Sequence, residues 1–270
     1  MRAKPFLKWA GGKYRLLDTI LNVLPTGGRF VEPFAGSCAV YQNCNFSNAL
    51  VCDLNADLIA LYQHLQHEGD DFIAYCQSFF TLANNTKERY LNLRERFNAS
   101  RNSRLRGALL LYLNRHAFNG LVRYNAKGGF NVPFGRYAKP YFPLGELRAF
   151  HRKTQEIKTE FVRADFRAVF AQLQADDVVY CDPPYVPLSK TANFTAYASG
   201  GFSPEDQQDL INLALAAQQK GIPVIVSNHD TEVTRALYAK AEIHQFQVRR
   251  FISCDRGNRA RAPELLAIYR

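Results

Sequence analysis

The chain has 270 residues, of which 47% are hydrophobic and 13% aromatic. This composition is typical of a globular protein and excludes a disordered chain. The formal net charge of +10 favours an anionic partner, with nucleic acid first and an acidic membrane surface second. No apolar run is long enough to cross a bilayer and no signal peptide is evident, so we expect no membrane-spanning segment, and we take nucleic acid, not a membrane, as the partner.

The cysteines and histidines show no metal-binding pattern. The six cysteines contain no Cys-x-x-Cys pair, and the six histidines are scattered along the chain. Reduced core cysteines are typical of a cytoplasmic protein. We therefore expect a cytoplasmic protein without a metal ion.

The first predicted elements are a helix over 14–24, a strand that starts at Arg29 and ends at Glu32 or Phe34, and a helix that begins near Ser37. Gly11 and Gly12 precede the first helix and allow backbone N–H groups to approach an anion, although the spacing of a P-loop is absent. A strand, a glycine turn and a helix form the start of doubly wound nucleotide-binding folds.

Asp53 ends the next predicted strand, 49–53, and lies 21 positions after Glu32. An acid at this place in such a fold commonly binds a ribose hydroxyl. The alternative is that Asp53 caps a helix that starts at Leu54 or Asn55.

Residues 57–144 are mainly helical in pattern and strongly basic. No acidic residue occurs between Glu95 and Glu146, whereas nine lysines or arginines lie there, interleaved with aromatic residues. The stretch 115–137 contains several glycines and Pro133, which predicts a hairpin with exposed side chains. Positive charges interleaved with aromatic side chains, without acidic residues between them, predict a nucleic-acid surface.

Strand–helix alternation resumes after residue 144. We predict a helix over 145–153, strands over 160–165, 178–181 and 222–226, a long helix opened by Ser203 and Pro204, and antiparallel last strands over 243–252 and 265–269. His229 follows a strand and is expected to be structural. A second basic patch is predicted from five arginines at 249, 250, 256, 259 and 261.

The segment Asp182-Pro183-Pro184-Tyr185 follows a buried strand directly. In open α/β sheets, ligands bind at this edge. An exocyclic amine of a nucleobase is a poor nucleophile because its lone pair is delocalised into the ring. The Asp182 carboxylate and the Pro183 carbonyl are suited to accept its two N–H groups, and Tyr185 is suited to stack on an extruded base.

The polar stretch 187–201 predicts a mobile loop over this site, in which Lys190 can reach a phosphate.

Together, the predicted strands and helices indicate an α/β fold class: a Rossmann-like doubly wound sheet with an antiparallel last strand and an inserted, mainly helical domain that carries a hairpin. We predict one α/β domain of residues 1–56 and 145–270 that carries this ligand-binding edge, interrupted by a basic domain of residues 57–144 that binds nucleic acid.

Three sequence blocks, the basic insertion and its predicted hairpin together resemble the Dam-type DNA adenine-N6 methyltransferases of bacteria and phages. They are 8–13 (KWAGGK), 33–36 (PFAG), the insertion with the hairpin sequences 119–125 (NGLVRYN) and 130–135 (FNVPFG), and 182–185 (DPPY), in the order of the family's α group. The likeness runs through essentially the whole chain.

The resemblance implies transfer of a methyl group from S-adenosylmethionine to N6 of adenine in GATC, with S-adenosylhomocysteine as product. The partner implied is double-stranded DNA, with no obligate protein partner. The implied catalytic residues are Asp182, Pro183, Pro184 and Tyr185. The implied cofactor-binding residues are Trp9, Ala10, Gly11, Lys13, Glu32, Phe34, Ala35, Gly36, Ser37, Asp53, Asp165, Phe166 and Asp182.

The implied DNA-binding residues include Lys8 and Arg123 at base edges and Leu121 and Pro133 at thymine methyl groups. The full set is Lys8, Arg115, Phe118, Asn119, Leu121, Arg123, Asn125, Pro133, Arg136, Tyr137, Lys139, Ser189, Lys190 and Asn193.

Two residues depart from the family pattern, Cys38 at a glycine position and Phe118 at an expected tyrosine. Cys38 is expected to weaken cofactor binding if close approach is needed there. The alternatives are a cytosine-N4 methyltransferase and a catalytically silent DNA-binding regulator. A nicotinamide oxidoreductase lacks the full glycine fingerprint and leaves the acid-free insertion unexplained.

Overall fold

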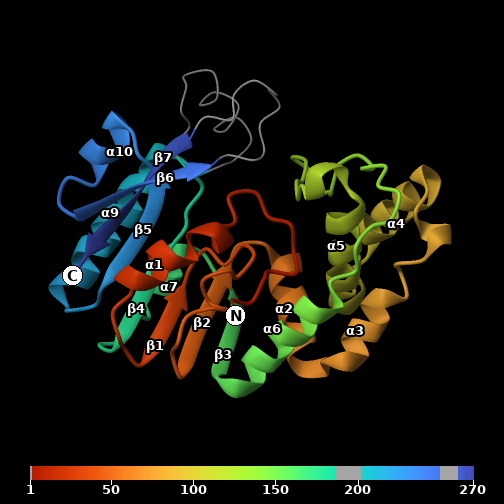
Figure 1. Ribbon diagram of the computed structural model, residues 1–270, viewed down its shortest axis with the longest axis horizontal. Helices are drawn as coiled ribbons and strands as arrows, with labels where there is room; N and C mark the ends of the chain where they lie inside the picture. The colour runs from red at the N-terminus through yellow and green to blue at the C-terminus, as the bar shows by residue number, and fades with distance from the viewer. Residues whose placement is uncertain (1, 186–201, 250–260) are drawn as a thin grey trace. The chain divides into compact units, whose positions relative to one another are not determined.

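A computed structural model describes residues 2–185, 202–249 and 261–270. Its seven-stranded sheet has the order β3-β2-β1-β4-β5-β7-β6 (Figure 1). The described pairs β2–β3, β1–β4 and β4–β5 are parallel, whereas β7 pairs antiparallel with both β5 and β6. The predicted doubly wound α/β class is thereby confirmed. The strands are β1 Arg29–Glu32, β2 Asn48–Asp53, β3 Lys158–Arg163, β4 Asp177–Cys181, β5 Val224–His229, β6 Glu242–Arg249 and β7 Arg261–Tyr269.

Apart from the helix predicted near Ser37, the described helices follow the predicted order, and α10 was not predicted. The α-helices are α1 Leu17–Val23, α2 Ala56–Glu68, α3 Asp70–Gln77, α4 Lys87–Ala99, α5 Ser103–His116, α6 Leu144–Glu156, α7 Phe166–Phe170, α9 Pro204–Gln219 and α10 Glu232–Leu237. The 3-10 helices are η1 Lys13–Leu16, η2 Leu82–Asn84 and η3 Phe118–Gly120.

The chain divides into two compact units, which we describe separately. Unit 1 comprises Met1–Leu17 and Ala35–Arg163, and unit 2 comprises Asp18–Phe34 and Ala164–Arg270. This division follows contacts within the chain. The sequence-based domains, 57–144 and the remainder, stay a prediction about function.

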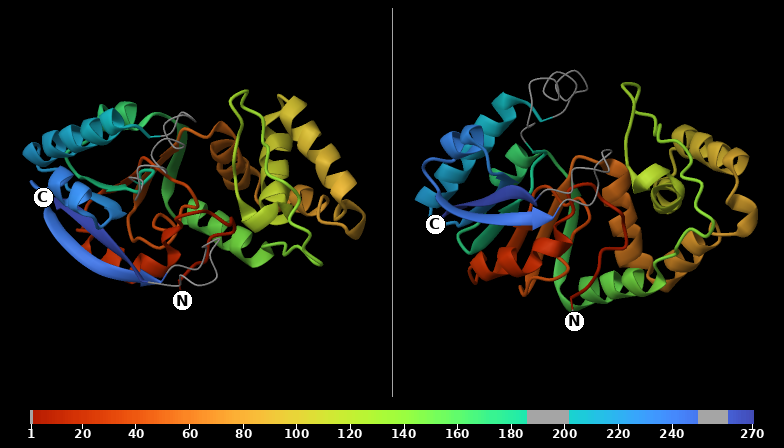
Figure 2. Two further views of the ribbon diagram at one scale, coloured as in Figure 1. Left: turned by 90° about the horizontal axis from the view of Figure 1, so that it is seen from above. Right: turned by 45° about the horizontal axis from the view of Figure 1, so that its top comes forward.

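In unit 2, the central strand β4 is buried along its whole length. Its register with β1 and β5 brings Val179 beside both Val31 and Val224. Helices α7 and α9 cover one face of these strands and α1 covers the other (Figure 2). Helix α9 begins at the predicted cap, where the Ser203 side chain and Asp206 form a capping box. The core therefore fixes the carboxyl end of β4, which precedes Asp182.

In unit 1, an aromatic cluster joins α2, α6 and β3. The rings of Tyr62, Phe150 and Phe161 lie 5.0–5.8 Å apart between centroids. Helices α2 and α5 approach closely at Gly107, where a Cβ would lie 3.1 Å from the Leu61 Cα. This contact explains a glycine in the interior of a buried helix, despite its low helix propensity.

The prediction of a helix that begins near Ser37 is wrong. The backbone there forms turns, in which Gln42 N–H donates to the Cys38 carbonyl and Cys44 N–H to the Val40 carbonyl. Cys38 has φ = 56°, in the left-handed region. A right-handed helix cannot pass through such a residue, so the segment after the glycine turn does not build a regular helix.

The predicted hairpin at 115–137 is present only in a reduced form. Residues 115 and 116 belong to α5, and two isolated antiparallel bridges, Ala117–Phe134 and Tyr124–Phe130, replace regular strands. Asn125 forms the turn between the arms, since its side-chain carbonyl accepts from the backbone N–H groups of Lys127 and Gly129.

Candidate active site and DNA-contact surface

The Asp182 carboxylate lies just beyond the end of β4 and contacts the neighbouring strand. Ser227 Oγ, on β5, lies 2.9 Å from Asp182 Oδ1 and 3.3 Å from the Cys181 carbonyl oxygen. The Tyr180 hydroxyl donates to Ser227 Oγ over 3.2 Å. Ser227 is fully buried, so this contact restricts the carboxylate to one orientation. No role was predicted for Ser227, although its place at the end of a strand parallel to β4 was a usable signal.

The rest of the segment is held by side chains of unit 2. Gln207 Nε2 of α9 donates to the Pro184 carbonyl over 3.1 Å, and the Tyr185 hydroxyl donates to Glu264 Oε2 over 3.1 Å. The Tyr185 ring meets His229 edge-to-face, with centroids 4.5 Å apart. Burial and the carboxylates of Asp182 and Glu264 raise the pKa of Tyr185, which keeps its hydroxyl protonated as a donor. His229 thus packs against the Tyr185 ring, and its structural role stays a prediction.

Three phenylalanines form a second cluster in unit 2. The ring centroids of Phe34, Phe166 and Phe202 lie 5.5–5.6 Å apart, and Phe34 and Phe166 are stacked. Phe34 and Phe166 were predicted to line a cofactor site, but Phe202 was not. Asp165 caps α7 by accepting from the Arg167 N–H over 2.9 Å. An apolar, flat-walled cluster of this kind suits a purine ring.

In unit 1, Asp53 contacts the glycine turn. Its Oδ2 accepts from the Gly36 N–H over 3.1 Å, and its Oδ1 accepts from the Asn55 N–H over 2.9 Å. The side chain of Asn55 caps α2, so Asp53 does not serve as the helix cap. Burial raises the pKa of the Asp53 carboxyl, and the backbone N–H groups oppose that rise.

Trp9 packs directly on Gly36, where φ is +45° and a Cβ would lie 2.8 Å from the indole Nε1. Glycine is therefore needed at this position for both its backbone conformation and the close approach. Lys13 is buried and donates to the Gly11 carbonyl over 2.6 Å. The structure thus brings Trp9, Gly36 and Asp53 together within unit 1. An acceptor carboxylate beside a tightly turned backbone is compatible with a ribose contact, which stays a prediction.

The other predicted cofactor residues lie on the same two short segments. Ala35 and Ser37 are buried in the turn around Gly36, and Glu32 is buried at the end of β1. Ala10 and Gly11 are exposed in the turn before η1.

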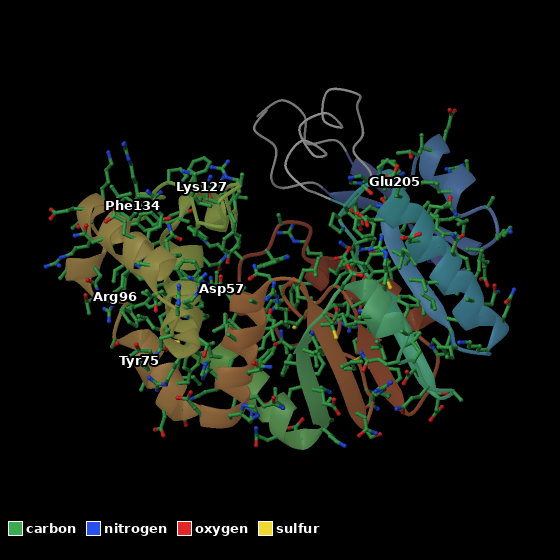
Figure 3. All side chains as sticks on the ribbon, turned by 180° about the vertical axis from the view of Figure 1, so that it is seen from behind. Asp57, Tyr75, Arg96, Lys127, Phe134 and Glu205 are labelled. Atoms are coloured by element: carbon green, nitrogen blue, oxygen red, sulfur yellow. The ribbon has the colours of Figure 1, made fainter. Side chains whose placement is uncertain are left out.

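Most predicted DNA-contact residues of unit 1 are at least partly exposed. Phe118 is 50% exposed, and Asn119 and Arg136 have φ of 54° and 55°. Arg123 is exposed and its Nε donates to Asn131 Oδ1 over 2.8 Å. The surrounding side chains are drawn in Figure 3, where Lys127 and Phe134 are labelled. The remaining partly or fully exposed members are Lys8, Leu121, Asn125, Pro133, Tyr137 and Lys139.

Arg115 differs from this group because it is only 8% exposed. Its guanidinium donates to the Phe6 carbonyl and lies 5.4 Å from the Tyr141 ring centroid. Burial lowers the pKa of Arg115, and Glu146 opposes this shift. The side chain therefore ties the amino-terminal segment to α5, and we do not retain it as a direct DNA contact.

Several predicted features lie outside the described residues. These are Ser189, Lys190 and Asn193, the loop 187–201 that contains them, and most of the second basic patch.

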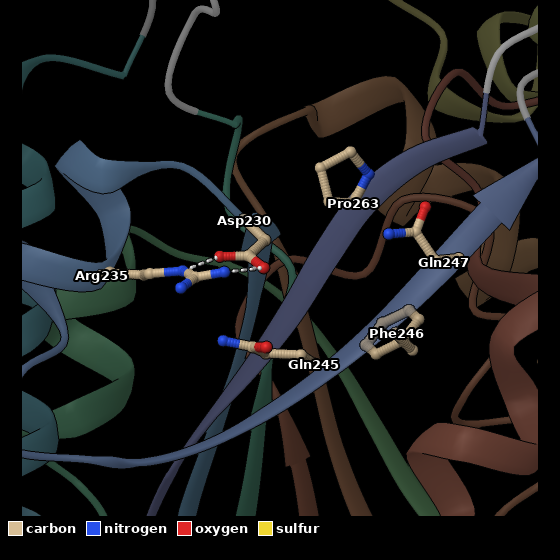
Figure 4. Close-up of a pocket in the computed structure, with 6 residues that line it drawn as sticks. All are labelled: Asp230, Arg235, Gln245, Phe246, Gln247 and Pro263. Atoms are coloured by element: carbon tan, nitrogen blue, oxygen red, sulfur yellow. Dashed lines mark hydrogen bonds and ion pairs between the residues drawn. The ribbon is translucent and has the colours of Figure 1, made fainter.

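A shallow pocket in unit 2 lies between β6, β7 and the segment before α10 (Figure 4). Arg235 and Asp230 form a two-bond ion pair at its edge, with N–O distances of 2.5 and 2.8 Å. The lining residues are Asp230, Arg235, Gln245, Phe246, Gln247 and Pro263. None is a predicted site residue, and we assign this pocket no role.

Within residues 2–185, 202–249 and 261–270, no helix is long and apolar enough to cross a membrane. The same residues contain no group of three histidine, cysteine or acidic side chains placed to hold a metal ion.

Sequence comparison identifies the class of enzyme to which this chain belongs. Residues 9–252 match the model of the D12 class of N6 adenine-specific DNA methyltransferases, and the chain belongs to this family. It is therefore an adenine-specific DNA methyltransferase.

Similar proteins include the DNA adenine methylase of Vibrio cholerae serotype O1, which is 46% identical over 269 residues that cover 99% of this chain and 96% of the relative. The DNA adenine methylase of Escherichia coli K12 is 46% identical over 267 residues, 99% of this chain and 95% of the relative. That of Serratia marcescens is 47% identical over 269 residues, 99% of this chain and 98% of the relative.

Among solved structures, a precorrin 8w decarboxylase from Methanobacterium thermoautotrophicum matches with a TM-score of 0.42 and 11% identity, over 100% of this chain and 98% of that one. A likeness at this level carries no functional conclusion.

Proposed function

We propose that the protein transfers a methyl group from S-adenosylmethionine to N6 of an adenine extruded from double-stranded DNA, with GATC as the target sequence. The observation that carries this proposal is the Asp182 carboxylate, held at the end of β4 by the buried Ser227 hydroxyl. Because the substrate is DNA, we expect the protein to act in the cytoplasm of a bacterium, as a cellular or phage-encoded enzyme.

The Asp182 carboxylate and the Pro183 carbonyl accept the two N–H groups of the target N6. This pulls the nitrogen toward tetrahedral geometry and localises its lone pair for in-line attack. S-adenosylmethionine would supply the methyl group from its positively charged sulfur: the new N–C bond forms as the C–S bond breaks, S-adenosylhomocysteine leaves with a neutral sulfur, and one N6 proton passes to water. Tyr185, fixed by Glu264 and His229, stacks on the extruded base. Positioning and electrostatics supply the acceleration, without a covalent enzyme intermediate.

We propose the following residues as cofactor contacts, stated for each unit by itself. In unit 1, Asp53 accepts the ribose hydroxyls, and Trp9 and Gly36 form the adjacent wall. In unit 2, Phe34 and Phe166 provide flat apolar surfaces for the adenine ring. The other members of the proposed cofactor set are Ala10, Gly11, Lys13, Glu32, Ala35, Ser37, Asp165 and Asp182.

We propose residues 57–144 as the DNA-recognition domain and the remainder as the catalytic domain. Arg123 and Lys8 bind base edges in the major groove, where both residue types pair with guanine. Phe118 fills the gap left by the extruded base, for which a phenyl ring suffices. Replacement of Arg123 by alanine should reduce discrimination at one base pair by about 1–3 kcal/mol. An equal loss on all DNA sequences would make it a phosphate contact.

The decisive experiment is nucleoside mass spectrometry on unmethylated plasmid DNA after incubation with the protein and S-adenosylmethionine. We expect N6-methyladenine from the native protein and none from Asp182→Ala, whose binding to DNA should be largely retained. N4-methylcytosine would keep the mechanism but overturn the substrate. Near-normal turnover of Asp182→Ala would overturn the proposed mechanism, and no methylated base with either protein would overturn the function.

A further inference from the structure

Asn114 is a fully buried amide in α5 that hydrogen-bonds two other segments of unit 1. Its Oδ1 accepts the Lys8 backbone N–H over 2.9 Å. Its Nδ2 donates to the Lys8 carbonyl over 2.7 Å and to the Gly120 carbonyl over 2.8 Å. Since one end of the amide meets an N–H and the other meets two carbonyls, only one orientation of the side chain satisfies these partners.

Lys8 is restrained at two further places. Gly120 has φ = +67°, and a Cβ there would lie 2.6 Å from the Lys8 Cβ and 2.4 Å from its Cδ. The aliphatic part of Lys8 therefore lies directly on the Gly120 backbone. Its Nζ lies 4.3 Å from the centroid of the Tyr137 ring, in a cation–π contact. Asn114 thus holds both the backbone of Lys8 and the backbone of Gly120, on which the Lys8 side chain lies.

We propose that Asn114 is a positioning residue for base recognition by Lys8. This inference rests on the proposed function, in which Lys8 binds a base edge. Residues 3–8 form no helix or strand, so regular secondary structure does not fix Lys8. Discrimination between bases requires the ammonium group at one location in the groove, which a freely moving segment does not provide. Asn114 is 0% exposed and acts through Lys8 without touching DNA.

Asn43 provides a matched control. Its Oδ1 accepts the Ala3 N–H over 2.8 Å, and its Nδ2 donates over 2.9 Å to the Ala3 and Ala39 carbonyls. The same set of three bonds thus holds the same amino-terminal segment, five positions before Lys8. If any loosening of this segment impairs recognition, Asn43→Ala should act like Asn114→Ala; if positioning of Lys8 matters, it should not.

The experiment measures kcat/KM on short duplexes that carry the target site or the site with one base pair changed. The variants are Lys8→Ala, Asn114→Ala, their double mutant and Asn43→Ala. The discrimination ratio between two duplexes is taken within one preparation, so the fraction of folded enzyme cancels. We expect Lys8→Ala to lower this ratio about tenfold at one base pair. Asn114→Ala should lower it at the same base pair, the double mutant should equal Lys8→Ala, and Asn43→Ala should leave it unchanged.

Independent, multiplicative effects in the double mutant would overturn the proposal, as would a ratio for Asn114→Ala equal to that for Asn43→Ala. An unchanged ratio for Lys8→Ala at every base pair would remove Lys8 from recognition and Asn114 with it, while N6-methyladenine formation would still support the proposed reaction. If Asn114→Ala does not fold, Asn114→Asp serves in its place. It keeps the acceptor for Lys8 N–H and loses both donations, so the same selective loss is expected.

Discussion

The proposed catalytic segment and the proposed DNA-contact segment are held in place by different means. Asp182 follows β4, whose backbone pairs with strands on both sides. Residues 117–143 have only two isolated bridges, and side chains of neighbouring helices bind their backbone instead. Where strands supply the stability, side chains at the strand ends are available for chemistry. Where side chains supply the stability instead, many of those side chains have a structural role.

Helix α4 shows how the second arrangement works. Tyr90, Arg94 and Asn98 are spaced four residues apart and so share one face of the helix. The Tyr90 hydroxyl and Arg94 Nη1 donate to the Val132 carbonyl, over 2.8 and 3.2 Å. Asn98 accepts from the Phe130 N–H over 2.8 Å and donates to its carbonyl over 3.2 Å. One helix face thus substitutes for a neighbouring strand, and single substitutions in this region should mainly reduce stability.

The largest expected effect follows from Arg106→Ala. Arg106 binds Asp57 through two bonds of 2.5 and 2.8 Å, and also donates to the Phe97 carbonyl over 2.7 Å. Its loss leaves a mostly buried carboxylate without its cation, and we expect the free energy of unfolding to fall by about 3–5 kcal/mol. Urea denaturation measures this change.

Tyr124→Phe is the control for this prediction. The Tyr124 hydroxyl donates to Asp57 Oδ2 over 2.9 Å, so its loss removes a single bond at the same carboxylate. The expected cost is about 1.5 kcal/mol. If Arg106→Ala lowers the free energy of unfolding no more than Tyr124→Phe does, side-chain networks do not hold this region. The proposed difference between this region and the sheet would then be wrong.

The next effect is a pH dependence that arises from His116. Burial lowers the pKa of His116 to about 4, although its contact with the Tyr112 carbonyl opposes the shift; Lys8 adds a smaller lowering. An unfolded histidine titrates near 6.5, so between about pH 6.5 and 4 the unfolded state binds more protons and stability falls on acidification. The shift corresponds to a loss of about 3 kcal/mol at pH 4.

His116→Phe should flatten this part of the pH profile. Phenylalanine keeps a ring at the position that stacks on Tyr112, where the centroids are 3.8 Å apart. Urea denaturation at several pH values from 4 to 7 would show the difference between the two profiles, and carboxylates shared by both proteins cancel in it. Parallel profiles would show that His116 is not held neutral by burial.

The strand-based region is the part that sequence patterns predict well. Short apolar runs located β1, β2, β4 and β5, and the Ser203-Pro204 pair placed the start of α9. The proposed reaction centre could also be located, since the prolines after Asp182 end the strand at a defined place. Both signals are local in sequence.

Contacts between distant side chains and irregular backbone could not be predicted in this way. Asn114 meets Lys8 across 106 positions, and a buried asparagine in a helical run carries no periodic signal of that role. Arg115 resembled a surface cation because the sequence shows its charge but not its burial. The helix expected after Ser37 failed because the left-handed conformation of Cys38 depends on its surroundings. That conformation also explains why glycine is expected at position 38.

The smallest expected effect tests the strand-based region. Ser227→Ala removes the hydroxyl that holds Asp182 Oδ1, and a hydrogen bond to a charged group contributes about 1.5–3 kcal/mol. If this contribution is made mainly in the transition state, kcat should fall at least about tenfold with little change in KM. Stability should fall by only about 1 kcal/mol, because the pairing of β5 with β4 and β7 does not involve the hydroxyl.

Tyr180→Phe is the control: it keeps the Ser227–Asp182 contact and should change kcat less than about twofold. A large loss of stability with unchanged kcat would reverse the contrast, since the strand ends would then depend on their side chains as strongly as the DNA-contact segment does.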